Sequence, residues 1–141
     1  MKSQIFINLP VKELERSLNF YTKMGFTNNP QFSDDSGKCM VFSDEIFVML
    51  LTHEKFKAFI TRPITDVSKT TSALFSISVE SLDRVNEISD NALSGGGKEP
   101  VEAKDYGFMQ QRTIEDPDGH IWEIFYMDMS KFPQNPEAAT Q

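Results

Sequence analysis

The sequence predicts an α+β fold of two tandem βαβββ modules, whose mixed sheets curve around a central cleft. The same order of strand and helix patterns occurs twice in 141 residues, and short matching segments relate the two halves. A polar stretch separates them. We therefore expect one domain at residues 1–129, with module one at 1–60, a linker at 61–72 and module two at 73–129. A polar tail follows at 130–141.

Module one begins with an apolar strand at residues 5–9, which Pro10 ends. Apolar residues then recur at helical spacing from residue 11 to residue 21, and Gly25 stops this helix. Strands at 38–42 and 46–51 follow turn residues, and a short helix is expected around 54–60.

Module two repeats this order. A strand at residues 73–79 precedes Ser81, a suitable N-cap, and an amphipathic helix that three consecutive glycines end. Strands near 107–115 and 120–126 flank the turn at 116–119. We therefore expect the second half to fold as the first does.

Two segment matches align the halves residue by residue. Residues 11–16 match 79–84, and residues 44–50 lie over 118–124. The alignment pairs Phe6 with Leu74 in the first strands and Met49 with Glu123 in the last strands. These four positions are expected to converge at the cleft. Coincidence between two ordinary strand-helix units is the alternative.

The composition limits the classes of partner that the chain is expected to bind. The net charge is -7 and no basic run occurs, which disfavours nucleic acid, because phosphates are neutralised by Lys and Arg. No long apolar segment suggests a signal peptide or a membrane partner, so we expect a cytoplasmic protein. Twelve Phe and seven Met suit either a tight core or an apolar cavity.

Two segments carry a resemblance to a known family. The sequence LPVKELERSLNFY at residues 9–21 and EDPDGHIWE at 115–123 resemble the glyoxalase/bleomycin-resistance/extradiol-dioxygenase superfamily, also called vicinal oxygen chelate proteins. The resemblance covers about residues 4–127 and looks closest to bacterial glyoxalase-related proteins without an assigned substrate. It implies a homodimer that binds a small molecule.

The resemblance also implies where a metal would bind. Enzymes of the family hold one divalent metal at the cleft floor, and the matching positions are Phe6, Met49 (or Leu50 in a shifted register), Leu74 and Glu123. Phe and Leu have no donor atom, and a thioether is too soft for hard cations. We therefore predict no metal ligands and no cofactor, and an unorthodox metal near Glu123 stays open.

Glu123 is the catalytic candidate. It shares a strand face with Ile121 and Phe125, and burial among apolar groups raises the pKa of a carboxyl unless a partner compensates. It is either an acid/base or ligand anchor, or a remnant of metal-binding ancestors that is now neutralised structurally.

The expected partner of Arg112 depends on the register of the last two strands. If residues 116–119 form a simple four-residue turn, Arg112 opposes Glu123 on one face and supplies positive charge there. A bulge in the turn would destroy this pairing. Solvent exposure of Arg112 at the sheet edge is the alternative.

Other ligand-binding candidates lie on the same strand faces: Asn8, Ser76, Phe47 and Phe125. Small polar groups beside apolar ones are typical of a ligand pocket, but they also suit a half-wet sheet surface. The aromatic residues suit a cavity wall, although core packing is their more common fate.

The remaining reactive residues are assigned structural roles. His53 and His120 are expected to be solvated loop histidines, because the repeat places them near the ends of different sheets. Asp116 and Asp118 are expected to bond backbone groups of their turn. Cys39 is expected to be a small buried residue within a strand.

Three functions remain open. The leading hypothesis is a small-molecule binding protein with a degenerate metal site and Glu123 as polar anchor. The alternative is an enzyme, so that enzymatic activity stays uncertain: a lyase or dioxygenase with a displaced metal or with metal-free acid/base chemistry at Glu123. A scaffold with a vestigial cleft is the third.

Overall fold

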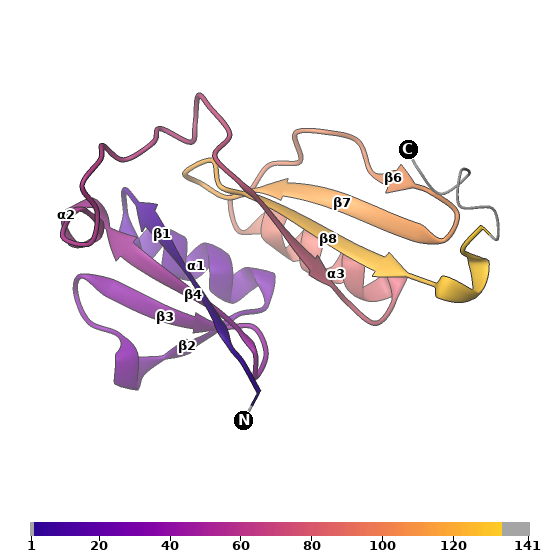
Figure 1. The fold of residues 1–141 in the computed structure, drawn as a ribbon, viewed down its shortest axis with the longest axis horizontal. Helices are drawn as coiled ribbons and strands as arrows, with labels where there is room; N and C mark the ends of the chain where they lie inside the picture. Colours follow the sequence, from indigo (N-terminus) through magenta and orange to yellow (C-terminus); the bar gives the residue numbers. More distant parts are fainter. Residues whose placement is uncertain (1, 134–141) are drawn as a thin grey trace.

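The computed structural model describes residues 2–133, and its elements follow the duplicated order (Figure 1). Module one contains β1 (Ile5–Val11), α1 (Leu14–Met24), β2 (Thr27–Asn29), a 3-10 turn (Pro30–Phe32), β3 (Gly37–Val41), β4 (Ile46–Thr52) and α2 (His53–Lys57). Module two contains β5 (Leu74–Ser78), α3 (Leu82–Ser94), β6 (Lys104–Asp105), β7 (Met109–Glu115) and β8 (Ile121–Met127). A 3-10 turn at Met129–Lys131 follows, and residues 134–141 of the predicted tail lie outside the described residues.

The strands form two four-stranded mixed sheets with one topology. The orders are β1-β4-β3-β2 and β5-β8-β7-β6, and in each sheet the first strand pairs in parallel with the last strand. The third strand of each module pairs with the last strand in antiparallel fashion. This arrangement confirms the predicted α+β fold. It also places β1 and β5 at one edge of their own sheets.

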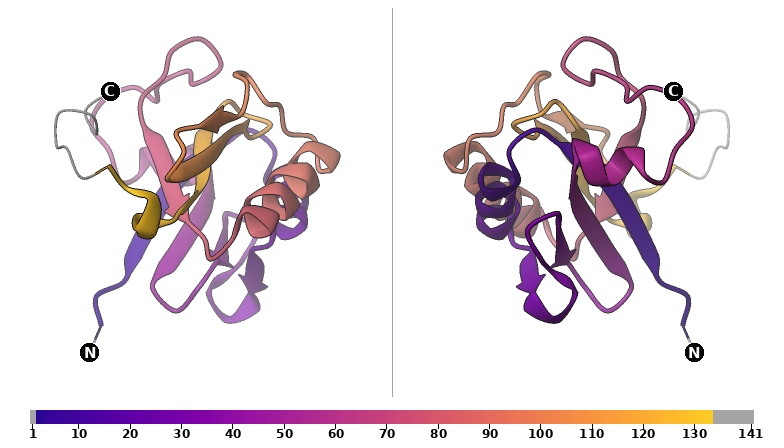
Figure 2. Two further views of the ribbon diagram at one scale, coloured as in Figure 1. Left: turned by 90° about the vertical axis from the view of Figure 1, so that its right-hand side faces the viewer. Right: turned by 90° about the vertical axis from the view of Figure 1, so that its left-hand side faces the viewer.

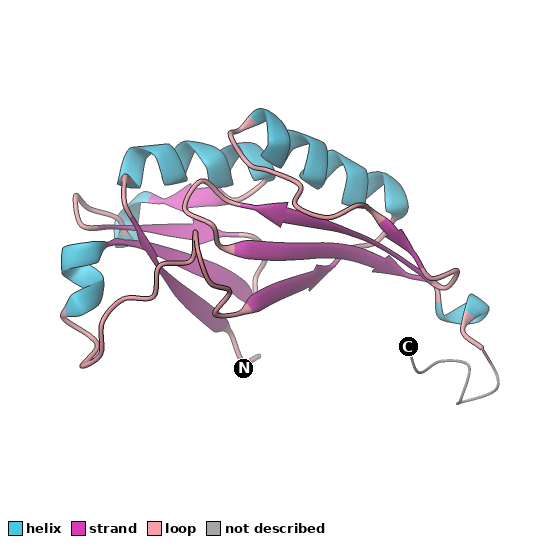
Figure 3. Cartoon of the chain, turned by 90° about the horizontal axis from the view of Figure 1, so that it is seen from above, coloured by secondary structure: helices cyan, strands magenta, loops and turns pink. Residues whose placement is uncertain are grey.

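The two long helices lie side by side on one face of the strand layer (Figures 2 and 3). Gly25 ends α1 with a φ of 123°, a conformation that glycine adopts without steric cost. Ser81 caps α3 as predicted, because its hydroxyl accepts the backbone N–H of Arg84. Within residues 2–133, no helix combines the length and the apolar character that crossing a membrane requires.

The core lies between the helices and the strands. Val48 and Leu50 of β4, and Trp122 and Ile124 of β8, are fully buried in one cluster with the helix residues. Burying such a side chain stabilises the fold by roughly 1.5–3 kcal/mol. Because side chains alternate along a strand, the intervening residues point to the opposite face, which we call the strand face. Cys39 is buried within β3, as predicted.

The turn at residues 116–120 organises the end of module two. The Asp116 Oδ1 atom accepts three backbone N–H groups, from Asp118, Gly119 and His120, each at 2.9 Å. This confirms the predicted structural role of Asp116. The Asp116 N–H donates to the His120 carbonyl oxygen at 2.8 Å, so the turn holds five residues instead of four.

A buried hydrogen-bond chain joins this turn to module one. The Tyr21 hydroxyl of α1 donates to Asp116 Oδ2 at 2.6 Å and accepts the indole N–H of Trp122 at 3.0 Å. Burial raises the pKa of Tyr21 well above its usual value, and the charge of Asp116 adds to this. Burial also raises the pKa of Asp116, opposed by the charge of His120 and by the hydrogen bond from Tyr21. We call Tyr21, Asp116 and Trp122 the clasp.

Two further residues of the turn contact the junction between β1 and α1. Asp118 accepts the Lys12 N–H at 2.9 Å and the Ser17 hydroxyl at 3.3 Å. Its side chain therefore bonds module one, and the prediction that it would serve its own turn is wrong. The prediction of a solvated His120 is also wrong, because the residue is 5% exposed and its Nε2 donates to the Pro10 carbonyl at 2.8 Å.

The clasp should contribute measurably to stability. Replacing Tyr21 with Phe leaves Asp116 Oδ2 and the Trp122 N–H buried without a partner, at about 1–3 kcal/mol for each group. We expect chemical denaturation of Tyr21→Phe to show a free energy of unfolding lowered by about 2–4 kcal/mol. Tyr126→Phe is the matched control, since Tyr126 packs against the same core and its hydroxyl has no partner within residues 2–133. Equal stability of the two variants would contradict the role of the clasp.

Candidate functional site

The positions at which a metal would be expected lie on the strand face. Phe6 of β1 stacks on Phe47 of β4 with ring centroids 4.4 Å apart, and its side chain is 48% exposed. Met49 lies opposite Asn8 in the same pair of strands. In module two, Leu74 is 55% exposed and lies opposite Ile121. Three of the four positions therefore offer apolar or thioether groups.

Glu123 is half-buried on the strand face of β8 and has two neutral partners. Its Oε1 accepts the Ser76 hydroxyl at 2.6 Å, and its Oε2 accepts the Gln111 side-chain amide at 3.2 Å. Ser76 lies opposite Glu123 in the β5–β8 register. The carboxylate is thus held by hydroxyl and amide donors, and sequence reasoning missed Gln111 because its position depends on the β7 register.

Arg112 is not opposite Glu123. The register pairs Thr113 with Glu123 and Arg112 with Ile124, one residue away from the pairing predicted for a four-residue turn. The five-residue turn causes this shift, and a one-residue shift moves a side chain to the other face. The predicted pairing of Arg112 with Glu123 is therefore wrong.

Arg112 lies instead on the side of the sheet that faces α3. Its guanidinium makes two bonds to the Glu99 carboxylate, at 2.9 and 3.0 Å, and one to Asp90 at 2.8 Å. It also reaches the Asn86 side chain at 3.2 Å. The hydrogen bonds to Glu99 raise the pKa of Arg112 above its usual value. The alternative of a solvated Arg112 is also wrong, because three side chains hold its guanidinium.

The donor set on the strand face does not fit a divalent metal. Hard cations require several oxygen or nitrogen ligands, and the four positions supply one carboxylate that Ser76 and Gln111 already engage. Within residues 2–133, no three His, Cys, Asp or Glu side chains gather in an arrangement able to hold a metal ion.

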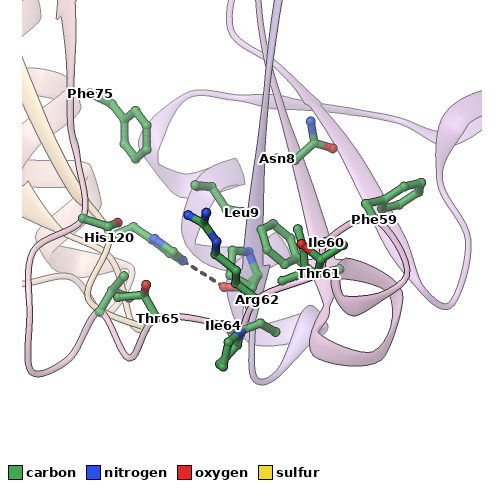
Figure 4. Close-up of a pocket in the computed structure, with 15 residues that line it drawn as sticks. Asn8, Leu9, Phe59, Ile60, Thr61, Arg62, Ile64, Thr65, Phe75 and His120 are labelled. Carbon is green, nitrogen blue, oxygen red and sulfur yellow. Dashed lines mark hydrogen bonds between the residues drawn. The ribbon is translucent and has the colours of Figure 1, made fainter.

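A pocket of about 590 Å³ lies where the linker passes over the junction of the two modules (Figure 4). Its walls come from β1, α2, the linker, Phe75 of β5 and His120 of the turn. This volume falls in the range of pockets for small molecules, about 300–1,000 Å³. Of the residues predicted to bind a ligand, Asn8 lines this pocket. The others lie outside its lining: Phe6, Phe47, Met49, Leu74, Ser76, Arg112, Phe125 and Glu123.

The lining of the pocket is mainly apolar with one cation. Nine of its fifteen residues are apolar: Leu9, Pro10, Phe56, Phe59, Ile60, Pro63, Ile64, Val67 and Phe75. Arg62 is the cationic side chain, and in Figure 4 it extends from the linker toward the side where Leu9 and His120 lie. Sequence reasoning missed this set because the linker has no periodic pattern. The available signal was a lone arginine between apolar residues, FITRPI at residues 59–64.

The linker is positioned by a close backbone contact with the turn. A methyl group at Gly119 would lie 2.5 Å from the Val67 carbonyl oxygen, and the Gly119 φ is 112°. Glycine is therefore required both for the backbone conformation and for the approach of the linker. Val67 in turn lines the pocket.

Gly119→Ala should displace the linker. Gly96→Ala is the matched control, because Gly96 has a similar φ of 104° and nothing within 4 Å of an added methyl group. Both variants carry the backbone strain, and Gly119→Ala alone carries the clash, which costs about 1–3 kcal/mol more. Thermal unfolding measures the difference, and amide exchange at residues 64–68 should become faster in Gly119→Ala. Equal destabilisation by the two changes would contradict the contact.

Comparisons with known proteins agree with this fold. The sequence pattern of the Glyoxalase/Bleomycin resistance protein/Dioxygenase superfamily matches residues 4–124. A comparison with curated protein sequences finds no match.

Among solved structures, hypothetical protein SA1046 from S. aureus superposes with a TM-score of 0.75 at 21% identity, covering 89% of this chain and 95% of that one. A glyoxalase/bleomycin resistance protein/dioxygenase family enzyme from Burkholderia phytofirmans PsJN gives 0.73 at 14% identity, with coverages of 89% and 99%. The fosfomycin resistance protein FosX from Listeria monocytogenes gives 0.65 at 13% identity, with 99% of each chain covered. At these identities the likeness establishes the fold alone.

Proposed function

The chain belongs to the Glyoxalase/Bleomycin resistance protein/Dioxygenase superfamily, and we propose that it binds a small molecule without the divalent metal of the superfamily's enzymes. The observation that carries the proposal is the donor set on the strand face. Phe6, Met49 and Leu74 stand where metal ligands would be expected, and their chemistry suits apolar contact with a ligand.

Glu123 is the polar anchor in this proposal. Its partners, Ser76 and Gln111, are both neutral, so no cation from residues 2–133 is in direct contact with the carboxylate. A carboxylate of this kind accepts hydrogen bonds from a ligand and fixes its orientation on the strand face, while Asn8, Phe47 and Phe125 complete the contacts. We therefore assign Glu123 a role in binding and orienting the ligand.

If the chain functions without a metal, it should not retain added divalent ions. After incubation with Zn²⁺, Mn²⁺, Ni²⁺ or Mg²⁺ and removal of free ions, elemental analysis should find well under about 0.1 equivalent per chain, since one carboxylate alone holds such ions weakly. Ligand affinity should be unchanged by a chelator. One equivalent of bound metal that disappears in Glu123→Gln would overturn the proposed function.

The alternative is a lyase or dioxygenase reaction with a metal-free acid/base step at Glu123. It is favoured by one observation: both carboxylate oxygens are held in fixed positions, by the Ser76 hydroxyl and the Gln111 amide. That reading requires Glu123→Gln to abolish turnover. Unchanged turnover in this variant would exclude it.

We also propose that two copies of the chain associate through the strand face. Phe6 and Leu74 are large apolar side chains that are about half exposed there, at 48% and 55%. Contiguous exposed apolar surface is typical of an interaction site, and closed two-fold dimers are the commonest assembly.

Light scattering coupled to size exclusion tests the dimer. The unmodified chain should have twice the monomer mass, and Leu74→Glu should shift it to the monomer, because a charge is costly in an apolar contact. Leu82→Glu is the control, since Leu82 is 43% exposed on α3, on the other face of the layer. A monomeric mass that does not change with concentration would contradict association.

A further inference from the structure

We propose that the pocket under the linker binds a small molecule with an apolar body and one anionic group, such as an aryl or alkyl carboxylate, and that Arg62 is the partner of that anion. The inference rests on the proposed function, that the chain binds a small molecule without a metal. It adds a second ligand site, apart from the Glu123 anchor on the strand face, and names the class of ligand that this site takes.

The size and apolar lining of the pocket determine the body of the ligand. The pocket holds about 590 Å³, and a second hollow of about 430 Å³ shares Asn8, Phe56, Phe59 and Ile60 with it. Three of the shared residues, Phe56, Phe59 and Ile60, are apolar and form a common wall of the two hollows. Such a wall favours an aromatic ring or a branched or linear alkyl chain, because apolar burial contributes most of the binding free energy.

The charge of the pocket lining determines which polar group the ligand should carry. Among the fifteen lining residues, all from the described part of the chain (residues 2–133), Arg62 is the one Lys or Arg, and none is Asp or Glu. This contrasts with the whole chain, whose net charge is -7. A lining with one guanidinium and no carboxylate favours an anionic ligand over a cationic one at this place.

Arg62 also differs from the other arginines of the chain. Of the four, Arg16 pairs with Glu13 and Asp118, Arg84 with Glu87, and Arg112 with Asp90 and Glu99. Arg62 has no carboxylate within 4.0 Å and makes no side-chain hydrogen bond within residues 2–133. Its planar fork of donors matches a carboxylate in a two-bond geometry.

Other polar groups of the lining complete the recognition. Thr65 and Ser72 supply hydroxyl donors from the linker, and His120 is fixed by its bond to the Pro10 carbonyl. The His120 ring therefore forms a rigid wall on the side toward which Arg62 extends (Figure 4). Because the contact between Gly119 and Val67 also holds the linker, the pocket is largely formed before a ligand arrives.

Matched pairs of acid and amide test the inference. The probes are benzoate, 3-phenylpropionate, 1-naphthylacetate and octanoate, each with its neutral primary amide, titrated into the full chain by calorimetry and by amide NMR. We expect at least one acid to bind about tenfold more tightly than its amide, with shifts at Asn8, Thr65 and Phe75, since a charged hydrogen bond is worth at least this factor. Arg62→Met should reduce the preference to less than about threefold.

Lys69→Met is the control, because it removes the same charge from the same linker at a residue outside every pocket lining described above. The acid preference should survive in Lys69→Met. An unchanged preference in Arg62→Met, or no acid binding below about 10 mM, would overturn the inference. Neither result would contradict the proposed function. That function would be contradicted instead if the chain bound stoichiometric metal at Glu123.

Discussion

The carboxylate of Asp116 is the group on which the rest of the structure depends. One oxygen accepts three backbone N–H groups and thereby closes a five-residue turn, and the other accepts the Tyr21 hydroxyl of module one. The first set of bonds fixes the register of β7 against β8. The second fixes the position of module two relative to α1, because the Trp122 indole bonds the same hydroxyl.

The register has consequences at both faces of the second sheet. A four-residue turn would have placed Arg112 opposite Glu123, whereas the five-residue turn places it against α3, where Glu99 and Asp90 bind it. Glu123 is left with Ser76 and Gln111, which are neutral. The negative charge of the strand face is therefore a result of how the turn is closed.

The duplication explains the fold, and the two turns show how the modules have diverged. The sequence repeat aligns Asp44 with Asp118, yet Asp44 is exposed in its turn while Asp118 is buried against Lys12 and Ser17 of module one. The regular elements were predictable, because helical spacing and strand alternation are local properties of the sequence. The burial of His120 and the course of the linker were not, because each depends on contacts between segments more than fifty residues apart, such as His120 with Pro10 and Gly119 with Val67. The register was not predictable either, because it depends on whether the turn holds four or five residues, which strand alternation does not reveal.

The polar groups available to a ligand consequently lie in two places with opposite charge. The strand face carries the Glu123 carboxylate among apolar side chains, and the pocket under the linker carries the Arg62 guanidinium among apolar side chains. A divalent metal would have attracted anionic oxygens to the strand face. The residues at the metal positions carry no positive charge and so cannot attract them. An anion is instead favoured at Arg62, at the junction that the turn and its glycine hold in place. The backbone contact between Gly119 and Val67 therefore also holds in place the linker that carries Arg62, the charged group that a ligand meets in this pocket.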